Sequence, residues 1–144
     1  MDTVYTDIYL DVFDVDKEPP VVKAVRDDTN SRVVRAYLTK RGENYSIGTD
    51  DTVTLWSKKP DGTVVSGLGE YFTIDEVSED NPSGRYGAEI VLNTTQTDTV
   101  GDIECQFRIE YQVQGGELSD VRTQKFILRV YENFDHDYLS AGQL

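Results

Sequence analysis

The sequence has little of the two side chains that most often hold metals or act as nucleophiles and bases, since it contains one cysteine and one histidine in 144 residues. A single cysteine excludes a disulfide within the chain. Cys105 lies in a row of alternating apolar residues, which predicts a small buried side chain and not a catalytic thiol. His136 lies in a polar segment outside the patterned residues, which favours a solvated tail over a site. We therefore expect no enzyme activity, no cofactor and no metal.

Long apolar runs are also missing. No stretch approaches the roughly 18 apolar residues that predict a membrane-spanning helix. Residues 1–7 have neither the basic part nor the apolar part of a secretory signal. Both observations predict a chain that is made and folded in a cytoplasm.

Basic residues are scarce, with 14 Lys and Arg against 27 Asp and Glu and a formal net charge of −13. Nucleic-acid binding depends on Lys and Arg contacts with phosphates, so this balance disfavours nucleic acid and an anionic membrane surface as partners. Two interpretations of the charge remain open. It can serve solubility, or it can match a partner with a basic face.

What the sequence does contain is alternation of polar and apolar residues, most clearly over residues 102–113. Successive side chains of a strand point to opposite faces, so this pattern predicts a strand with one dry and one wet face. Similar patterns predict further strands, which cover residues 5–15, 21–26, 32–40, 52–58, 71–77, 85–92 and 126–130. Pro19 and Pro20 remove two backbone donors just before residues 21–26, which indicates an edge strand there.

Turn chemistry separates the predicted strands. Lys59-Pro60-Asp61-Gly62 has the proline and glycine positions of a type I turn, and Gln114-Gly115-Gly116-Glu117 closes a hairpin. Turns recur at the spacing of a β-sandwich or barrel. The one helical candidate is a single turn at Thr95–Val100. We predict an all-β domain over residues 1–131, followed by a polar C-terminal tail or the start of a linker over residues 132–144.

Carboxylates are numerous enough for pairs to occur by chance. Asp7 and Asp11 share a strand face with Tyr5, Tyr9 and Phe13, a combination that can bind sugar. A half-exposed strand packed against a neighbour explains the pattern better, and an exposed aromatic row would favour a protein contact surface. The acidic clusters at residues 27–30 and 79–81 do not have the spacing of a calcium loop, and turn formation explains them.

Four segments together resemble the N-terminal domain of the baseplate upper protein family of tailed phages of Gram-positive bacteria. They occur in the family's order and are residues 21–34 (VVKAVRDDTNSRVV), residues 53–65 (VTLWSKKPDGTVV), Gly84-Arg85-Tyr86 and residues 101–107 (GDIECQF). The resemblance extends over about residues 5–131. It implies an immunoglobulin-like antiparallel β-sandwich in the virion tail baseplate. It also implies docking on the distal tail hub protein and a connection to receptor-binding proteins, without catalytic residues.

The residues we expect to contact a partner lie on the two predicted edges, and they are Tyr5, Tyr9, Phe13, Val21 and Val22. The acidic opening segment could meet a basic hub surface. Whether the chain also forms a homo-oligomer in the baseplate is left open. A carbohydrate-binding β-sandwich that contacts host cell-wall polysaccharide is the alternative, because the chain has nine tyrosines and Trp56 beside many acids. A hydrolase would need carboxylates that converge in a cleft, and no spacing favours one.

Overall fold

Two β-sheets packed face to face form the domain in a computed structural model, which describes residues 3–76, 78–80, 84–113 and 115–133. Sheet A contains, in order, β1 (Val4–Asp11), β3 (Arg32–Lys40), β8 (Arg85–Val91) and β7 (Glu70–Asp75), and β4 (Glu43–Asn44) pairs with β3. Sheet B contains, in order, β2 (Val21–Val25), β11 (Phe126–Tyr131), β9 (Gly101–Gln112), β5 (Thr52–Lys58) and β6 (Val64–Leu68), and β10 (Leu118–Arg122) pairs with β9. The predicted all-β sandwich is confirmed.

Most neighbouring strands are antiparallel, as predicted, but two pairs are parallel. β1 runs parallel to β3, and β2 runs parallel to β11. A parallel pair needs a long crossover between its strands, and β2, which lies in the other sheet, provides this crossover between β1 and β3. The immunoglobulin-like antiparallel arrangement that the resemblance implies is therefore confirmed only as a two-sheet β-sandwich.

The core between the sheets comes directly from the alternation in the sequence. In β9, Ile103, Cys105, Phe107 and Ile109 are all buried, while the residues between them face outward. The Phe107 ring packs on that of Phe126 with 5.8 Å between the centroids. Complete burial of such apolar side chains contributes about 1.5–3 kcal/mol each, so this layer supplies much of the stability.

The helical candidate is present as α1 (Thr94–Thr97), which is shorter than the predicted turn. Asn93 caps it, because the Asn93 side chain accepts a hydrogen bond from the Thr95 backbone N–H at 2.8 Å. The Gln96 side chain in return accepts from the Asn93 N–H at 2.9 Å. In the predicted Lys59–Gly62 turn, the Gly62 N–H donates to the Lys59 carbonyl at 2.9 Å, which confirms the turn.

The first strand ends earlier than the sequence pattern predicts, at Asp11 and not at Val15. The Asp11 carboxylate accepts hydrogen bonds from the backbone N–H groups of Phe13 and Asp14, each at 2.7 Å. An aspartate side chain that accepts hydrogen bonds from the backbone two and three residues later turns the chain. The strand therefore stops at Asp11, although the alternation in the sequence continues to Val15.

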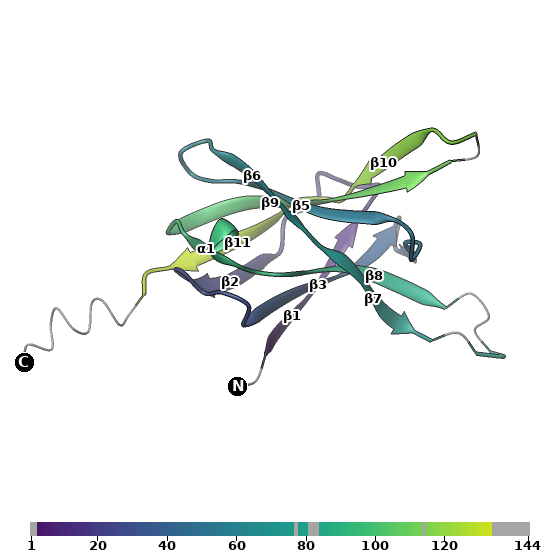
Figure 1. The fold of residues 1–144 in the computed structure, drawn as a ribbon, viewed down its shortest axis with the longest axis horizontal. Helices are drawn as coiled ribbons and strands as arrows, with labels where there is room; N and C mark the ends of the chain where they lie inside the picture. The colour runs from purple at the N-terminus through teal and green to yellow at the C-terminus, as the bar shows by residue number, and fades with distance from the viewer. Residues whose placement is uncertain (1–2, 77, 81–83, 114, 134–144) are drawn as a thin grey trace, which may run out of the picture.

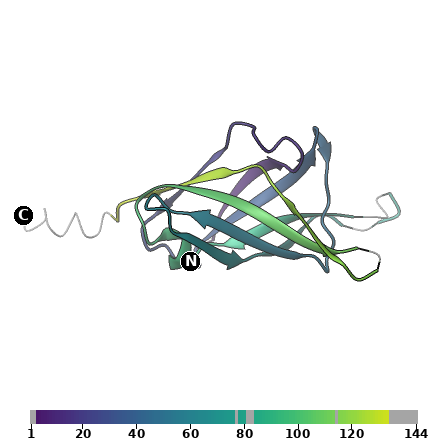
Figure 2. The same cartoon turned by 90° about the horizontal axis from the view of Figure 1, so that it is seen from above.

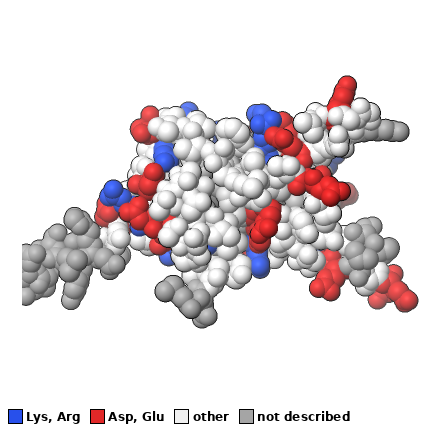
Figure 3. Space-filling view, viewed as in Figure 1, with Lys and Arg blue, Asp and Glu red and all other residues white. Residues whose placement is uncertain are grey.

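The molecule is elongated (Figure 1 and Figure 2). The β7–β8 pair and the β9–β10 pair both extend toward the same end, where acidic side chains gather with little basic charge beside them (Figure 3). Among the described residues, no helix is long and apolar enough to cross a membrane. Of the predicted tail over residues 132–144, residues 134–144 lie outside the described residues, so the predicted domain limits stay a prediction.

Candidate partner-binding surface

The edge of sheet A formed by β1 carries two of the five residues predicted to contact a partner. The Tyr5 and Tyr9 side chains are 52% and 69% exposed. Their inward neighbours Ile8 and Leu10 are buried in the core. The two tyrosines therefore stand on the outer face of the sheet, as the alternation predicts.

An aromatic row continues from these tyrosines across the outer face of sheet A. Tyr9 stacks on Tyr37 of β3 with 5.2 Å between the ring centroids, and Tyr37 contacts Phe72 of β7 edge-on at 5.5 Å. Arg35 lies over Tyr5, with its guanidinium carbon 4.0 Å from the ring centroid. These five side chains are called the aromatic face below.

Each contact within the aromatic face restricts a ring. Aromatic pairs of this geometry contribute about 0.5–1.5 kcal/mol each beyond their buried area, and the cation–π contact contributes about 0.5–1 kcal/mol. Arg35 is held in addition by an ion pair with Glu89 at 3.1 Å. A surface of large, prearranged side chains loses little conformational entropy when a partner binds, which suits it to protein contacts.

Tyr37 and Phe72 were not among the predicted contact residues. Tyr37 comes into contact with Tyr9 because β1 and β3 pair in parallel with these two residues directly opposite each other. The alternation in the sequence indicates that the Tyr9 and Tyr37 side chains face outward from their strands, but it does not show which strands are neighbours. Phe72 lies flat over Gly87, where an added Cβ would be 2.6 Å from the ring, so a glycine is needed beneath it.

The remaining three predicted residues lie apart from the aromatic face. Phe13 follows β1 and is half exposed beneath Arg41, whose guanidinium carbon is 3.8 Å from the ring centroid. Val21 is exposed at the start of β2 in sheet B. Val22 is only 1% exposed and packs in the core, because adjacent residues of a strand point to opposite faces. Its side chain therefore cannot reach a partner.

The two carboxylates considered for acid–base chemistry have different environments. Asp7 is exposed, whereas Asp11 is 1% exposed. Burial raises the pKa of Asp11, but hydrogen bonds from the Asp14 and Phe13 backbone and the nearby Lys17 ammonium outweigh it and lower the pKa to about 2. An aspartate that is ionised and fully engaged in this way fixes a turn and is unsuited to proton transfer.

A hollow of about 610 Å³ runs beside the β1 edge. Its walls come from β1, from the segment that leads into β2 and from Gln124. Gln124, in the wall of the hollow, is held beside Asp11, because its side-chain Oε1 accepts from the Asp11 N–H at 2.8 Å. The hollow therefore lies on the open side of the sandwich, where the edges of the two sheets face each other.

A second region of interest is on the outer face of sheet B, around Trp56. A hollow of about 300 Å³ is lined by Trp56, Gln106, Arg108 and Arg122, and Trp56 also lines a second hollow of about 180 Å³. The Arg108 guanidinium is already paired with Asp120 at 2.9 Å and with Glu110 at 3.4 Å. Trp56 Nε1 donates to Thr54 Oγ1 at 3.1 Å.

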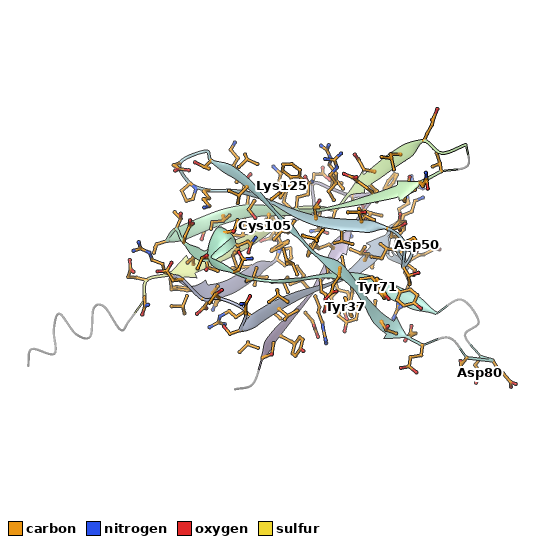
Figure 4. All side chains as sticks on the ribbon, in the orientation of Figure 1. Tyr37, Asp50, Tyr71, Asp80, Cys105 and Lys125 are labelled. Atoms are coloured by element: carbon orange, nitrogen blue, oxygen red, sulfur yellow. The ribbon has the colours of Figure 1, made fainter. Side chains whose placement is uncertain are left out.

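Of the cysteine and the histidine considered for chemistry, only the cysteine lies among the described residues. Cys105 is 1% exposed inside the sandwich (Figure 4), which confirms the predicted buried side chain. Burial raises the pKa of its thiol to about 11, although a contact with the Ser57 hydroxyl opposes this, so the thiol stays protonated at neutral pH. His136 lies outside the described residues. Within the described ranges, no three His, Cys, Asp or Glu side chains are grouped to hold a metal.

No family model matches the chain, and no curated protein matches it. Among solved structures, the chain is similar to the N-terminal domain of phage TP901-1 ORF48, with a TM-score of 0.60 and 16% sequence identity. The match covers 90% of this chain and 99% of that one. That domain belongs to a baseplate upper protein, the kind of protein that the ordered sequence segments resemble. The chain therefore has the fold of a phage baseplate upper protein's N-terminal domain.

Proposed function

We propose that this chain is a non-enzymatic structural domain of a phage tail baseplate, which docks on the distal tail hub protein and connects it to receptor-binding proteins. The main support is that the fold similarity to the ORF48 domain and the four ordered sequence segments point to the same kind of domain independently. The match covers nearly all of both chains, so the similarity does not rest on a shared fragment. The virion tail is the expected location.

The aromatic face gives this proposal a physical basis. Exposed Tyr5 and Tyr9 are continuous with Tyr37 and with Arg35, and aromatic and arginine side chains dominate the binding energy of protein interfaces. A docking domain needs such a surface and a rigid scaffold beneath it. Asp7 and Asp11 do not form an acid–base pair, since the Asp11 carboxylate is engaged in a turn and Asp7 stands exposed.

The test is to mix the purified chain with the hub protein encoded in the same gene cluster. A stable complex in size-exclusion chromatography at about tens of micromolar is the expected result, because specific interfaces have micromolar or tighter affinity. An unrelated acidic β-sandwich of similar size serves as the control for nonspecific charge binding. Separate elution of the chain and the hub at these concentrations would contradict the proposal.

A second function, carbohydrate binding, is favoured by one observation, the two hollows that Trp56 lines. A tryptophan flanked by Gln106 and Arg108 offers an apolar ring and hydrogen-bonding groups to a sugar. Binding to host cell-wall polysaccharide on a glycan array, lost in Trp56→Ala but kept in Leu118→Ala, would support it. A blank array together with hub binding would eliminate it.

A further inference from the structure

The outer edge of β1 has unused backbone hydrogen-bonding groups. The Val4 N–H donates to the Ser31 carbonyl and the Val12 N–H donates to the Thr39 carbonyl, both at 2.8 Å. The backbone N–H and C=O groups of the even-numbered residues of β1 therefore point toward β3. Alternation then turns the backbone groups of Tyr5, Asp7 and Tyr9 away from the sheet. β1 is the last strand of sheet A, and no described strand pairs with this outer edge.

This open stretch has a defined end. At Asp11 the outward N–H donates to Gln124 Oε1, and the outward carbonyl accepts from the Gln124 N–H, both at 2.8 Å. Gln124 thus occupies the place that a neighbouring strand would take, and it leaves the edge open only from Tyr5 to Tyr9. The adjacent hollow of about 610 Å³ gives an added strand room for its side chains.

The charges of the hollow favour one kind of occupant. Asp7 and Glu18 line it, and neither forms an ion pair with a described residue. The lysine in the wall, Lys17, is engaged with Asp11 at 3.4 Å. A second copy of the chain is disfavoured, because antiparallel pairing centred on Asp7 would place two carboxylates opposite each other, and like charges across strands are destabilising.

The geometry points to β1 as a strand-addition site that takes an extended, basic segment of a partner protein into the edge from Tyr5 to Tyr9. Main-chain hydrogen bonds would provide affinity, while Asp7 and Glu18 would select basic side chains. The identity of that partner as the tail hub rests on the proposed function, whereas the strand-addition site does not.

The direct test uses no hub protein. The full ¹⁵N-labelled chain is titrated with a short capped peptide that alternates Lys and Val, and with the same peptide carrying Glu in place of Lys. The Lys peptide is expected to shift the amide signals of Tyr5, Asp7 and Tyr9 in a saturable way, and the Glu peptide is not. Unchanged β1 amides at millimolar Lys peptide, or equal shifts with both peptides, would overturn the inference.

Two variants at position 7 separate the contribution of the backbone hydrogen bond to peptide binding from that of the carboxylate charge. Asp7→Pro removes the outward N–H and the carboxylate, whereas Asp7→Asn removes only the charge. Ser66→Pro on the edge strand β6 is the matched control, because the alternating bonds to β5 turn its N–H outward as well. We expect Asp7→Pro to weaken Lys-peptide binding about tenfold or more and Asp7→Asn only a few-fold. Equal binding by Asp7→Pro and Ser66→Pro would overturn the site.

The same variants distinguish this inference from the proposed function. If the wild-type chain binds the hub and Asp7→Pro binds it equally well, the hub does not use this edge, although the proposed function stands. If the wild-type chain does not bind the hub, the proposed function fails, and the peptide titration still decides whether β1 accepts a strand.

Discussion

The outer faces of the two sheets differ in how their side chains contact one another. On sheet B, charged residues satisfy one another across strands, as in the pairs Arg108–Asp120 and Arg129–Asp102. On sheet A, rings of the aromatic face contact one another, and the Tyr5 and Tyr9 side chains stay more than half exposed. Paired surface charges contribute little to stability but keep a face soluble. From this contrast we expect that sheet A carries the contact surface of the proposed function, while sheet B supports it.

The largest expected effect comes from a substitution in the core that both sheets share, because it destabilises both faces together. Phe107 lies in β9 of sheet B and is completely buried against Phe126. Phe107→Ala should lower the free energy of unfolding by about 3–5 kcal/mol, because it removes apolar contacts and leaves a cavity. Chemical denaturation followed by tryptophan fluorescence measures this. A loss below about 1 kcal/mol would show that the sheets do not share one core.

The second prediction distinguishes the faces by binding. The double variant Tyr5→Ser and Tyr9→Ser should weaken hub binding by about 2 kcal/mol or more, as expected for central aromatic contacts. Leu68→Ser, at a strongly exposed apolar residue of sheet B, is the control and should bind normally. Isothermal titration calorimetry compares the two. Equal losses in both variants would remove the distinction between the sheets.

The third prediction concerns the turn that ends β1. Asp11→Ala should lower the free energy of unfolding by about 1–2 kcal/mol, because two part-buried backbone N–H groups lose their acceptor. The lowered pKa also predicts a pH dependence. The folded pKa of about 2 lies below the ordinary value of 3.8, so this stabilisation is complete above about pH 4 and is lost as the pH falls toward 2. Thermal melts between pH 5 and 2 should show this component in the wild type and not in Asp11→Ala.

The smallest effect is expected for the ion pairs of sheet B. Asp120→Asn should change the free energy of unfolding by less than about 1 kcal/mol, since Asp120 and Arg108 are both partly exposed and Glu110 also contacts Arg108. Hub binding should stay unchanged. Denaturation at low and high salt measures the effect, and a loss above about 2 kcal/mol would give sheet B a larger role than we assign to it.

The sequence predicted the features that depend on local pattern. The alternation in β9 and the Lys59–Gly62 turn are correct, because side-chain period and turn chemistry act over a few residues. Three strands were not predicted. β4 has two residues, and neither β6 nor β10 has a buried residue, so hydrophobic alternation gives little signal for them. Pairing across the sheet, and not local pattern, makes these segments strands.

The candidate site was predictable only in part for the same reason. Exposed Tyr5 and Tyr9 follow from the alternation of β1, whereas the contact of Tyr9 with Tyr37 requires the parallel register of β1 and β3. The burial of Asp11 depends on Thr39 and Lys17, which approach it only in the folded chain. Which side of an alternating strand is covered, and by what, is decided by tertiary structure.

The parallel pairing of β2 with β11 has a mechanical consequence. A pull on the two ends of the domain draws β1 backward along its own direction past β3, and it draws β11 forward along its own direction past β2. All the hydrogen bonds of this pair, and those between β1 and β3, are then strained together in shear, and they do not open one after another as in a hairpin. The domain is thus built to resist tension along its chain.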